Sequence, residues 1–436
     1  MTKKKIAILG TGMAGFGASR RLREEQVEVV LYEKNSYYGG HTASHRVDPG
    51  FIFDEGPHVS FTKDERIQNI LAENVGGKFE TVKYNLNNYW RGHWVTHPVQ
   101  NFLHGLPDDL VVSIIKEFAA LQATPPAEAH NYEDWLLGSY GETFSRTFPM
   151  AYTEKYHTTL AANMTTEWIG PRMHRPSLEE VIRGALSRSV PNPHYISEFR
   201  YPTAGGFMAY IKAFADQSKI IFDRKMVGLN PVRRELRFAN GETALYDGVV
   251  SSIPLPDLIP LIDGVPGDVL RAAQRLACST CLVVNIGVNR PDVTDMHISY
   301  FYDHDIVFPR LSFPHNMSPN NGPRGTSSIQ AEVYFSNKYR PLQGSPSDYI
   351  EPVLRDLRRC GLLRDDDDLL CKTVQLCRYA NVIFDHDRSP SLKVVHGFLD
   401  EIGVGYCGRY GDWGYMWTDE SFKSGERAAE TTLSRL

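Results

Sequence analysis

Residues 5–15 read Lys-Ile-Ala-Ile-Leu-Gly-Thr-Gly-Met-Ala-Gly, and the rest of the fold is organised around this stretch. Its apolar run predicts a buried strand. Its glycines have the spacing that permits a tight turn, a close approach of pyrophosphate to the backbone, and close packing of the next helix. A second apolar run at 27–32 predicts another strand, which ends in Glu33. We therefore expect a βαβ dinucleotide-binding unit with the pyrophosphate at the helix N-terminus; the alternative is a glycine-rich turn without a ligand.

Glu33 favours a cofactor with a free ribose 2′-hydroxyl, because a carboxylate at a strand end accepts hydrogen bonds from that group and repels a 2′-phosphate. The carboxylate is therefore stronger evidence against NADP than it is for choosing between NAD and FAD as the cofactor. The sequence continues Glu33-Lys34-x₄-Gly39-Gly40. This pattern resembles the extended signature of the FAD-binding superfamily of amine oxidases, protoporphyrinogen oxidases and UDP-galactopyranose mutases. The resemblance implies FAD as the cofactor.

Composition describes an ordinary globular protein of 436 residues, 42% apolar and 23% charged, with a net charge of −5. No basic patch dominates, so a nucleic-acid partner is not expected. The six cysteines are scattered, as in reduced cytosolic proteins, and no signal peptide or membrane span is expected; the predicted location is the cytoplasm. Cys278 and Cys281 form a C-x-x-C that leads into an apolar run, which favours packed thiols over a metal or redox site, and no metal is expected.

The resemblance implies an α/β fold with a discontinuous, glutathione-reductase-like Rossmann-type FAD domain, a helical insertion and an antiparallel β-sheet substrate domain. The expected boundaries are 1–80, 200–255 and 395–436 for the FAD domain, 107–199 for the helical substrate or cap domain, and 81–106 with 256–394 for the sheet domain.

Further stretches resemble the UDP-galactopyranose mutases in particular, and they occur in the same order along the chain. They are Gly-Pro-His-Val-Ser-Phe-Thr at 56–62, Tyr-Thr-Glu-Lys at 152–155, the segment 192–206, Pro-Arg-Leu-Ser-Phe at 309–313 and Gly-Arg at 408–409. The implied activity is pyranose–furanose isomerisation of a nucleotide sugar through an adduct at N5 of the reduced flavin, in glycan or glycoside biosynthesis. The implied partners are that substrate and a reductant, NAD(P)H or a flavin reductase; a homodimer is one option for the assembly.

The same resemblance assigns roles to individual residues. Catalytic roles fall on His58, which the resemblance places on the face of the flavin, and on Arg310 and Arg409, because two guanidiniums can grip a diphosphate in fork geometry. The implied cofactor contacts are Gly10, Gly12, Met13, Ala14, Gly15, Glu33, Lys34, Gly39, Gly40, His41, Val227, Gly408, Arg409, Gly414, Tyr415 and Met416. The implied substrate contacts are Tyr152, Tyr195, Phe199, Tyr379 and Asn381. Structural roles stay open for three of these residues: loop shaping for His58, an ion pair for Arg310 and core packing for Tyr152.

Several positions depart from the mutase pattern and keep other functions open. Tyr156-His157 stands where mutases have Gln-Trp, Phe199 replaces a substrate tyrosine, and Asn381 falls where a tyrosine contacts the phosphates. The alternative function is an FAD-dependent oxidoreductase of the amine oxidase or protoporphyrinogen oxidase type, for which Trp413, Tyr415 and Trp417 would line an aromatic cage. A flavin-binding scaffold without turnover is the third option.

Overall fold

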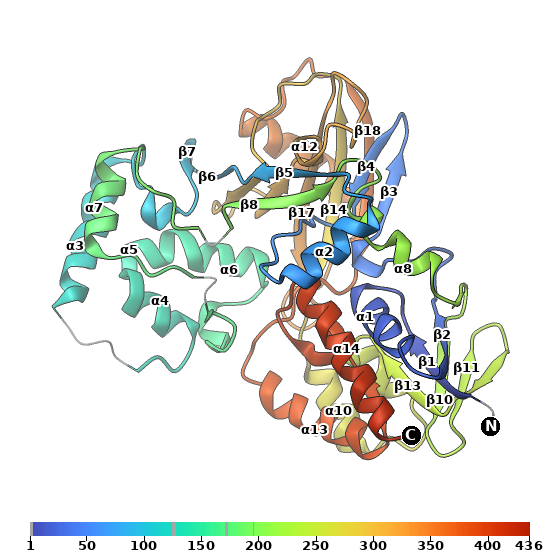
Figure 1. Cartoon of the computed structure of the whole chain (residues 1–436). Coiled ribbons are helices and arrows are strands. Elements are labelled where there is room, and N and C mark those ends of the chain that lie inside the picture. The colour runs from blue at the N-terminus through green and yellow to red at the C-terminus, as the bar shows by residue number, and fades with distance from the viewer. Residues whose placement is uncertain (1–2, 124–127, 171–172, 195) are drawn as a thin grey trace.

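The structure is a computed structural model that describes residues 3–123, 128–170, 173–194 and 196–436. Figure 1 shows three groups of elements: a parallel sheet with its helices at the lower right, a large mixed sheet above it, and a cluster of helices at the left. The chain passes between these groups more than once, so each of the two large sheets is assembled from segments that are distant in sequence.

The parallel sheet carries the glycine-rich turn. Its strand order is β19 (Val404–Tyr406), β13 (Gly248–Ser251), β1 (Lys4–Leu9), β2 (Val27–Tyr32) and β9 (Ile220–Ile221). Helices α1 (Met13–Leu22) and α14 (Thr418–Ser434) pack together with almost no space between their backbones. A Cβ added at Gly17 would lie 2.1 Å from the carbonyl oxygen of Phe422, and one added at Gly425 would lie 1.9 Å from that of Ala14. The last helix therefore buttresses the first, as expected for a discontinuous Rossmann-type domain.

The large sheet has the order β18 (Leu369–Cys377), β14 (Thr280–Val288), β17 (Ser327–Phe335), β16 (Arg310–Ser312), β15 (Ile298–Phe301), β6 (Leu86–Trp90) and β7 (His93–Thr96). It is antiparallel as expected except at the β6–β15 pair, which is parallel. The exception arises because β6 belongs to an early part of the chain and joins the sheet from outside its sequential hairpins. Strand β17 is buried along its whole length, since the sheet is covered on both faces there.

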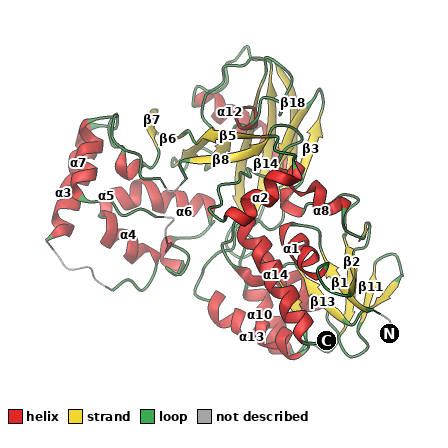
Figure 2. Ribbon diagram, in the orientation of Figure 1, coloured by secondary structure: helices red, strands yellow, loops and turns green. Residues whose placement is uncertain are grey.

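The left-hand group in Figure 2 is helical, as predicted for the insertion. It contains α3 (Asp108–Gln122), α4 (Tyr132–Tyr140), α5 (Glu142–Ser145), α6 (Ala151–Tyr156) and α7 (Leu178–Leu186). Its core is a ladder of rings, Tyr140, Phe144 and Phe148, with successive centroids 5.2 Å apart. Helix α6 lies at the edge of this group next to the large sheet, so it carries insertion residues toward the centre of the molecule.

The remaining elements connect these groups. Strands β3 (Ser44–Val47) and β4 (Phe51–Asp54) form a hairpin around the turn at 48–50. The other elements are α2 (Glu65–Asn74), β5 (Phe79–Lys83), β8 (Glu198–Pro202), α8 (Lys212–Asp216), β10 (Met226–Asn230), β11 (Glu235–Phe238), β12 (Thr243–Leu245), α9 (Leu255–Leu258), α10 (Gly267–Arg275), α11 (Pro314–Met317), α12 (Ile350–Arg359) and α13 (Arg388–Glu401).

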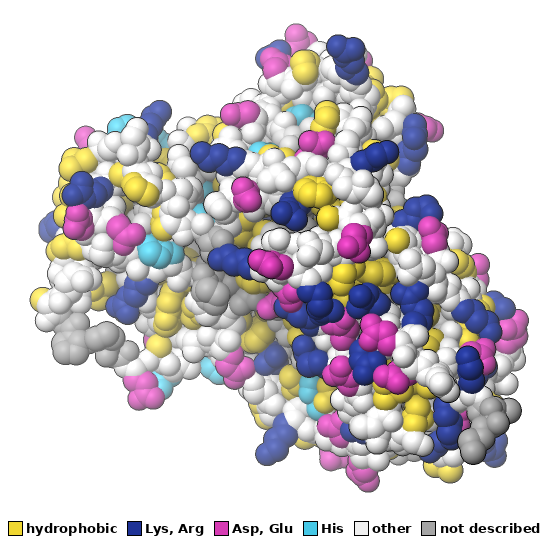
Figure 3. Space-filling view, in the orientation of Figure 1, with side chains coloured by type: hydrophobic (Ala, Val, Ile, Leu, Met, Phe, Trp, Pro, Cys, Tyr) yellow, Lys and Arg dark blue, Asp and Glu magenta, His cyan; other side chains and the backbone are white. Residues whose placement is uncertain are grey.

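The surface in Figure 3 mixes basic and acidic side chains, most densely over α1 and α14. Ion pairs account for part of this mixing, for instance Arg66 with Glu426 at 2.6 Å and Arg21 with Glu430 at 3.1 Å. Within the described residues, we find no helix with the length and apolar character that crossing a bilayer requires.

Candidate functional site

The glycine-rich turn is built so that backbone, and not side chains, faces a ligand. Gly10 adopts a φ of +104°, and a Cβ at Gly15 would lie 2.2 Å from the Gly10 carbonyl oxygen. Gly12 faces the second glycine pair: a Cβ added at Gly40 would lie 3.4 Å from the Gly12 Cα, and the Gly39 amide donates to the Thr11 carbonyl at 3.1 Å. Both glycine motifs therefore line one backbone trough.

The N-terminus of α1 fits a pyrophosphate. Its N-cap is Gly12, which provides no side-chain cap, and its first turn contains no acidic residue. The free amides at this end and the helix dipole favour an anion. The C-terminal tail crosses this end of the helix at Gly408, which has a φ of +77°. The approach is close: a Cβ added at Gly408 would lie 2.7 Å from the Cβ of Ala14. The residues present thus fit the FAD that the sequence implies.

Glu33 lies buried at the end of β2 beside this trough. Its carboxylate accepts from the Thr11 hydroxyl at 2.6 Å and from the Asn35 amide at 3.0 Å, which leaves acceptor capacity for a ribose hydroxyl. The segment that holds the exposed Val227 is nearby, since the Arg224 amide donates to the Glu33 carbonyl at 2.7 Å. Lys34, the next residue along, points to solvent.

Beyond the trough, two histidines surround the carboxylate of Glu55. Its carboxylate lies 3.0 Å from His45 Nε2 and 3.5 Å from His41 Nδ1. Burial raises the pKa of Glu55, but the hydrogen bonds from these two imidazoles outweigh it and bring the pKa to about 2. Donor atoms of His41, Glu55 and Cys377 lie within 4.8 Å of one another. His41 also contacts the ring of Tyr410, with centroids 5.4 Å apart.

His58 stands next to this cluster. Its Nδ1 lies 2.9 Å from the Gly56 carbonyl, which defines the ring orientation and, with Nδ1 as donor, leaves Nε2 as the acceptor. Burial lowers the pKa of His58 to about 4, and the nearby His41 and Arg409 contribute in the same direction. The imidazole is therefore neutral at neutral pH.

Arg310 extends from β16 into a buried polar pocket of the large sheet. Its guanidinium forms a two-pronged ion pair with Glu332 of β17, with one contact at 2.8 Å, and lies 3.4 Å from the Tyr334 hydroxyl. The ring of Tyr156 covers it, with 5.4 Å between the guanidinium carbon and the ring centroid. The Glu332 side chain is 2% exposed and that of Arg310 is 20% exposed, so the carboxylate is shielded from water and the guanidinium is largely buried.

Arg409 approaches the same place from the C-terminal tail, and its guanidinium donates to backbone carbonyls. Nη1 donates to Ala380 at 3.1 Å and Nε to Met416 at 3.0 Å, while the guanidinium carbon lies 5.6 Å from the Tyr415 ring centroid. Gly414, between them, donates to the Arg409 carbonyl at 3.0 Å. Across the described residues, Arg409 has no carboxylate within ion-pair distance.

Two tyrosines join the arginines. The hydroxyls of Tyr156 and Tyr415 lie 3.5 Å apart, and Tyr156 covers Arg310 while Tyr415 covers Arg409. Tyr152 stacks on Tyr156 with centroids 5.1 Å apart. The structure therefore brings Tyr152, Arg310, Arg409 and Tyr415 into one group, which we call the tyrosine–arginine cluster together with Tyr156, Glu332 and Tyr334.

The other expected substrate residues have different positions. Tyr379 donates to Asp257 at 2.8 Å, and Asn381 pairs through its backbone with Ser279, so both flank the cluster near Ala380. Phe199 packs instead between Tyr84 and His297, with centroids 5.1 and 5.2 Å away. Tyr195 lies outside the described residues. Of the two thiols, Cys281 is buried, which raises its pKa well above the usual range, and Cys278 is half-buried.

Sequence reasoning missed Glu332, Tyr334 and Tyr156. A signal for the first two exists in β17, where Ser328, Gln330, Glu332 and Tyr334 alternate with apolar residues and so share one face. On a strand buried on both faces, such a polar row indicates a functional or structural hydrogen-bond network.

Comparison with known proteins gives one family and several relatives. The family model described as flavin containing amine oxidoreductase matches residues 13–433. A 4,4′-diapophytoene desaturase (4,4′-diaponeurosporene-forming) of Staphylococcus aureus is 38% identical over 69% of this chain and 66% of its own length. The same enzyme of Staphylococcus haemolyticus is 24% identical over 70% of this chain, and again only 66% of the relative is spanned.

Solved structures cover the whole chain. That of a reduced UDP-galactopyranose mutase superposes with a TM-score of 0.93 at 26% identity and covers 100% of this chain and 96% of the mutase. That of a putative protoporphyrinogen oxidase from Exiguobacterium sp. 255-15 gives a TM-score of 0.76 at 16% identity, with 100% of both chains covered.

Proposed function

Because this chain belongs to the flavin-containing amine oxidoreductase family, whose cofactor is FAD, we propose that it is a mutase of a nucleotide sugar. In this role it interconverts the pyranose and furanose forms of the sugar with no net oxidation. The single observation that carries the proposal is the tyrosine–arginine cluster. It places guanidiniums from two distant segments against Tyr156 and Tyr415, whose hydroxyls lie 3.5 Å apart, and a likeness to the reduced mutase extends over the whole chain.

The charges of the cluster favour an anionic substrate. Glu332 offsets the charge of Arg310, whereas Arg409 donates only to carbonyl groups in the described structure. A guanidinium held away from water without a carboxylate partner is stabilised by an anion. A diphosphate meets this requirement, and Arg409 would also stabilise the negative charge that develops when the diphosphate leaves the sugar.

A bound reduced flavin supplies the nucleophile for such a reaction. The protein residues hold the sugar and exclude water. His58 stays neutral, so it does not compete with the arginines for the diphosphate. The rings of Tyr152, Tyr156 and Tyr415 surround the guanidiniums and keep water from the charges, which strengthens their attraction for the substrate. The glycine trough and Glu33 would hold the dinucleotide.

A second candidate function is an FAD-dependent oxidoreductase. The observation that favours it is the 38% identity to the Staphylococcus aureus desaturase, together with the replacement of mutase aromatics by His157 and Asn381. In that case a suitable substrate bleaches the flavin directly, and air restores the colour with formation of peroxide.

The test is chromatography of UDP-galactopyranose and a panel of other nucleotide sugars after incubation with the purified enzyme, with and without dithionite. We expect a new isomer peak only under reduction. Arg409→Lys keeps the charge but loses the fork, and should reduce kcat/KM roughly tenfold or more. Arg378→Lys, at an exposed guanidinium near the same cluster, is the matched control and should change little. Equal turnover by oxidised enzyme, or flavin bleaching by an amine without any isomer, would contradict the mutase reading.

A further inference from the structure

Lys155 is a buried cation that the proposed mechanism does not use. It belongs to α6, where it lies three residues after Tyr152 and directly before Tyr156, and it is 6% exposed. Its ammonium donates to three backbone carbonyls: Asp303 at 2.8 Å, Phe308 at 3.0 Å and Phe301 at 3.2 Å. Three donors meet three acceptors, so every N–H of the ammonium is used.

The three carbonyls belong to one segment, 301–308, which joins β15 to β16 and leads directly into Arg310. Two further contacts hold this segment from the other side: the Val307 amide donates to Asp356 at 2.8 Å, and Arg359 pairs with Asp305 at 2.7 Å. Lys155 is therefore the contact through which the helical insertion holds the segment before Arg310.

The surroundings of Lys155 make its charge sensitive to pH. Burial lowers its pKa from 10.5 to about 7. Asp303, Asp305, Asp356 and the Cys360 thiol face it and act in the opposite direction. These carboxylates are engaged elsewhere, since Asp303 accepts from the Arg91 amide at 3.1 Å while Asp305 and Asp356 hold the segment as described.

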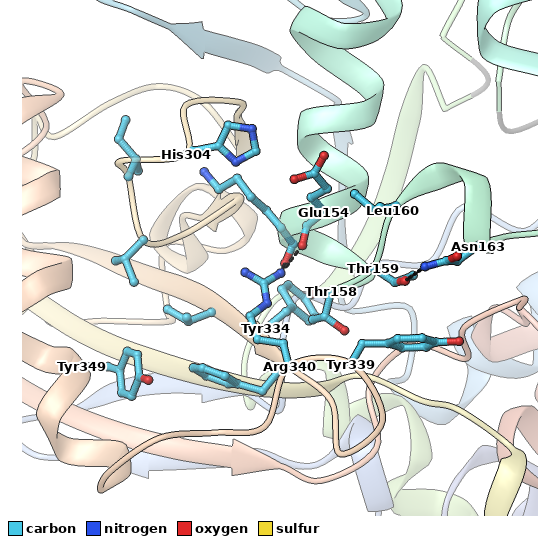
Figure 4. A pocket seen from close by; sticks show the side chains of 15 residues that line it. Glu154, Thr158, Thr159, Leu160, Asn163, His304, Tyr334, Tyr339, Arg340 and Tyr349 are labelled. Atoms are coloured by element: carbon cyan, nitrogen blue, oxygen red, sulfur yellow. Dashed lines mark hydrogen bonds between the residues drawn. The ribbon is translucent and has the colours of Figure 1, made fainter. Parts of the chain in front are cut away.

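A cavity of about 590 Å³ lies beside α6 and is lined by Lys155, Glu154, His304 and Arg340 among others. Figure 4 shows Glu154, His304 and Arg340 around it. Arg340 closes the C-terminal end of α6 by donating to the carbonyls of Glu154 and Lys155. The cavity gives solvent and protons a route to the ammonium, whereas Tyr152 and Tyr156 continue the same helix into the tyrosine–arginine cluster.

We propose that Lys155 is a positioning residue that couples the helical insertion to Arg310: its ammonium holds segment 301–308, and loss of one proton frees one carbonyl and loosens that segment. The link to substrate binding rests on the proposed function, but the coupling itself does not. Two outcomes follow as the pH rises through 7. The amides of 301–308 lose protection, and the affinity of the tyrosine–arginine cluster, of which Arg310 is a part, for a diphosphate falls.

As the pH rises above 7, the global free energy of unfolding should increase while segment 301–308 loosens. The opposite signs distinguish a positioning role of Lys155 from a general contribution to stability. The folded pKa of Lys155 lies below the unfolded value, so the unfolded chain binds more protons between pH 7 and 10.5. This linkage raises the stability contributed by Lys155 over that window, while the local segment loosens.

The first experiment is hydrogen–deuterium exchange of the FAD-loaded enzyme at pH 6 and 8.5, expressed as protection factors. The Ile306 and Val307 amides, which bond to Asp303 and Asp356, are the reporters. We expect their protection to fall roughly tenfold in the wild type, the effect of one hydrogen bond to a charged group. Lys155→Arg cannot lose its charge in this range and should show no such fall. Lys155→Met, without donors, should have low protection at both pH values. Equal pH responses in the wild type and Lys155→Arg overturn the proposal, even where Lys155→Met fails to fold.

The second experiment measures the dissociation constant of UDP at the same two pH values. We expect a larger weakening at pH 8.5 in the wild type than in Lys155→Arg. Protection that changes as expected with no binding of UDP or of any other nucleoside diphosphate at either pH leaves the coupling in place and contradicts the proposed function. UDP binding with an identical pH response in both proteins contradicts the coupling and leaves the proposed function in place.

Discussion

The glycine trough and the tyrosine–arginine cluster recognise anions by different means. In the trough, residues 10–15 and 39–40 present backbone amides, and the glycines act by having no side chain. In the cluster, side chains from α6, β16, β17 and the tail must meet at one point. We therefore expect the glycine trough to be most sensitive to added side-chain atoms, and the tyrosine–arginine cluster to be most sensitive to the loss of a charge.

The largest effect should come from the charge of the cluster. Glu332→Gln keeps the shape but leaves the largely buried Arg310 guanidinium without a counter-ion, so we expect a loss of about 3 kcal/mol in the free energy of unfolding. Urea unfolding of the FAD-loaded protein measures it. The double variant Arg310→Met/Glu332→Gln should recover part of the loss, because the unpaired charge is gone. A loss in the single variant below about 1 kcal/mol would mean that the pair behaves as an exposed one.

An added methyl group tests the trough. Gly15→Ala places a Cβ 2.2 Å from the Gly10 carbonyl oxygen, so the turn must shift; we expect a loss of about 1–3 kcal/mol and weaker FAD retention. Gly138→Ala is the matched control, since Gly138 is also helical but has no atom within 4 Å of the new Cβ. The control should be neutral or up to about 1 kcal/mol stabilising. Thermal unfolding and flavin absorbance after gel filtration report both quantities, and equal behaviour of the two variants would contradict the close approach.

The smallest effect is expected at Phe199, which lies outside both regions. Phe199→Tyr adds the hydroxyl that mutases have, but here the ring is 1% exposed between Tyr84 and His297. We expect a destabilisation of about 1–2 kcal/mol from a buried hydroxyl and an unchanged dissociation constant for UDP. Titration of the variant with UDP checks this, and tighter binding would return Phe199 to the substrate site.

The two regions also differ in how far sequence predicts them. The trough depends on spacing within 36 residues of one segment, from Lys5 to Gly40, so local rules predict its strands, turn and glycine pairs. The cluster depends on which strands become neighbours. The β16–β17 register sets Arg310 opposite Glu332, and no local pattern contains that register. The parallel β6–β15 pair and the position of Phe199 were unpredictable for the same reason, since both depend on contacts between distant segments.

The tight packing of α1 against α14 has a consequence for the order of folding. The glycine-rich turn is made early in synthesis, but the helix that buttresses it begins at Thr418, and β19 at Val404 also completes the parallel sheet late. A nascent chain therefore exposes the apolar face of α1 until α14 has been synthesised. Closing a loop of this length costs entropy before any contact compensates, so the step is slow. We expect flavin to bind only after α14 has formed, and a truncation within α14 to affect the cofactor site at the glycine-rich turn.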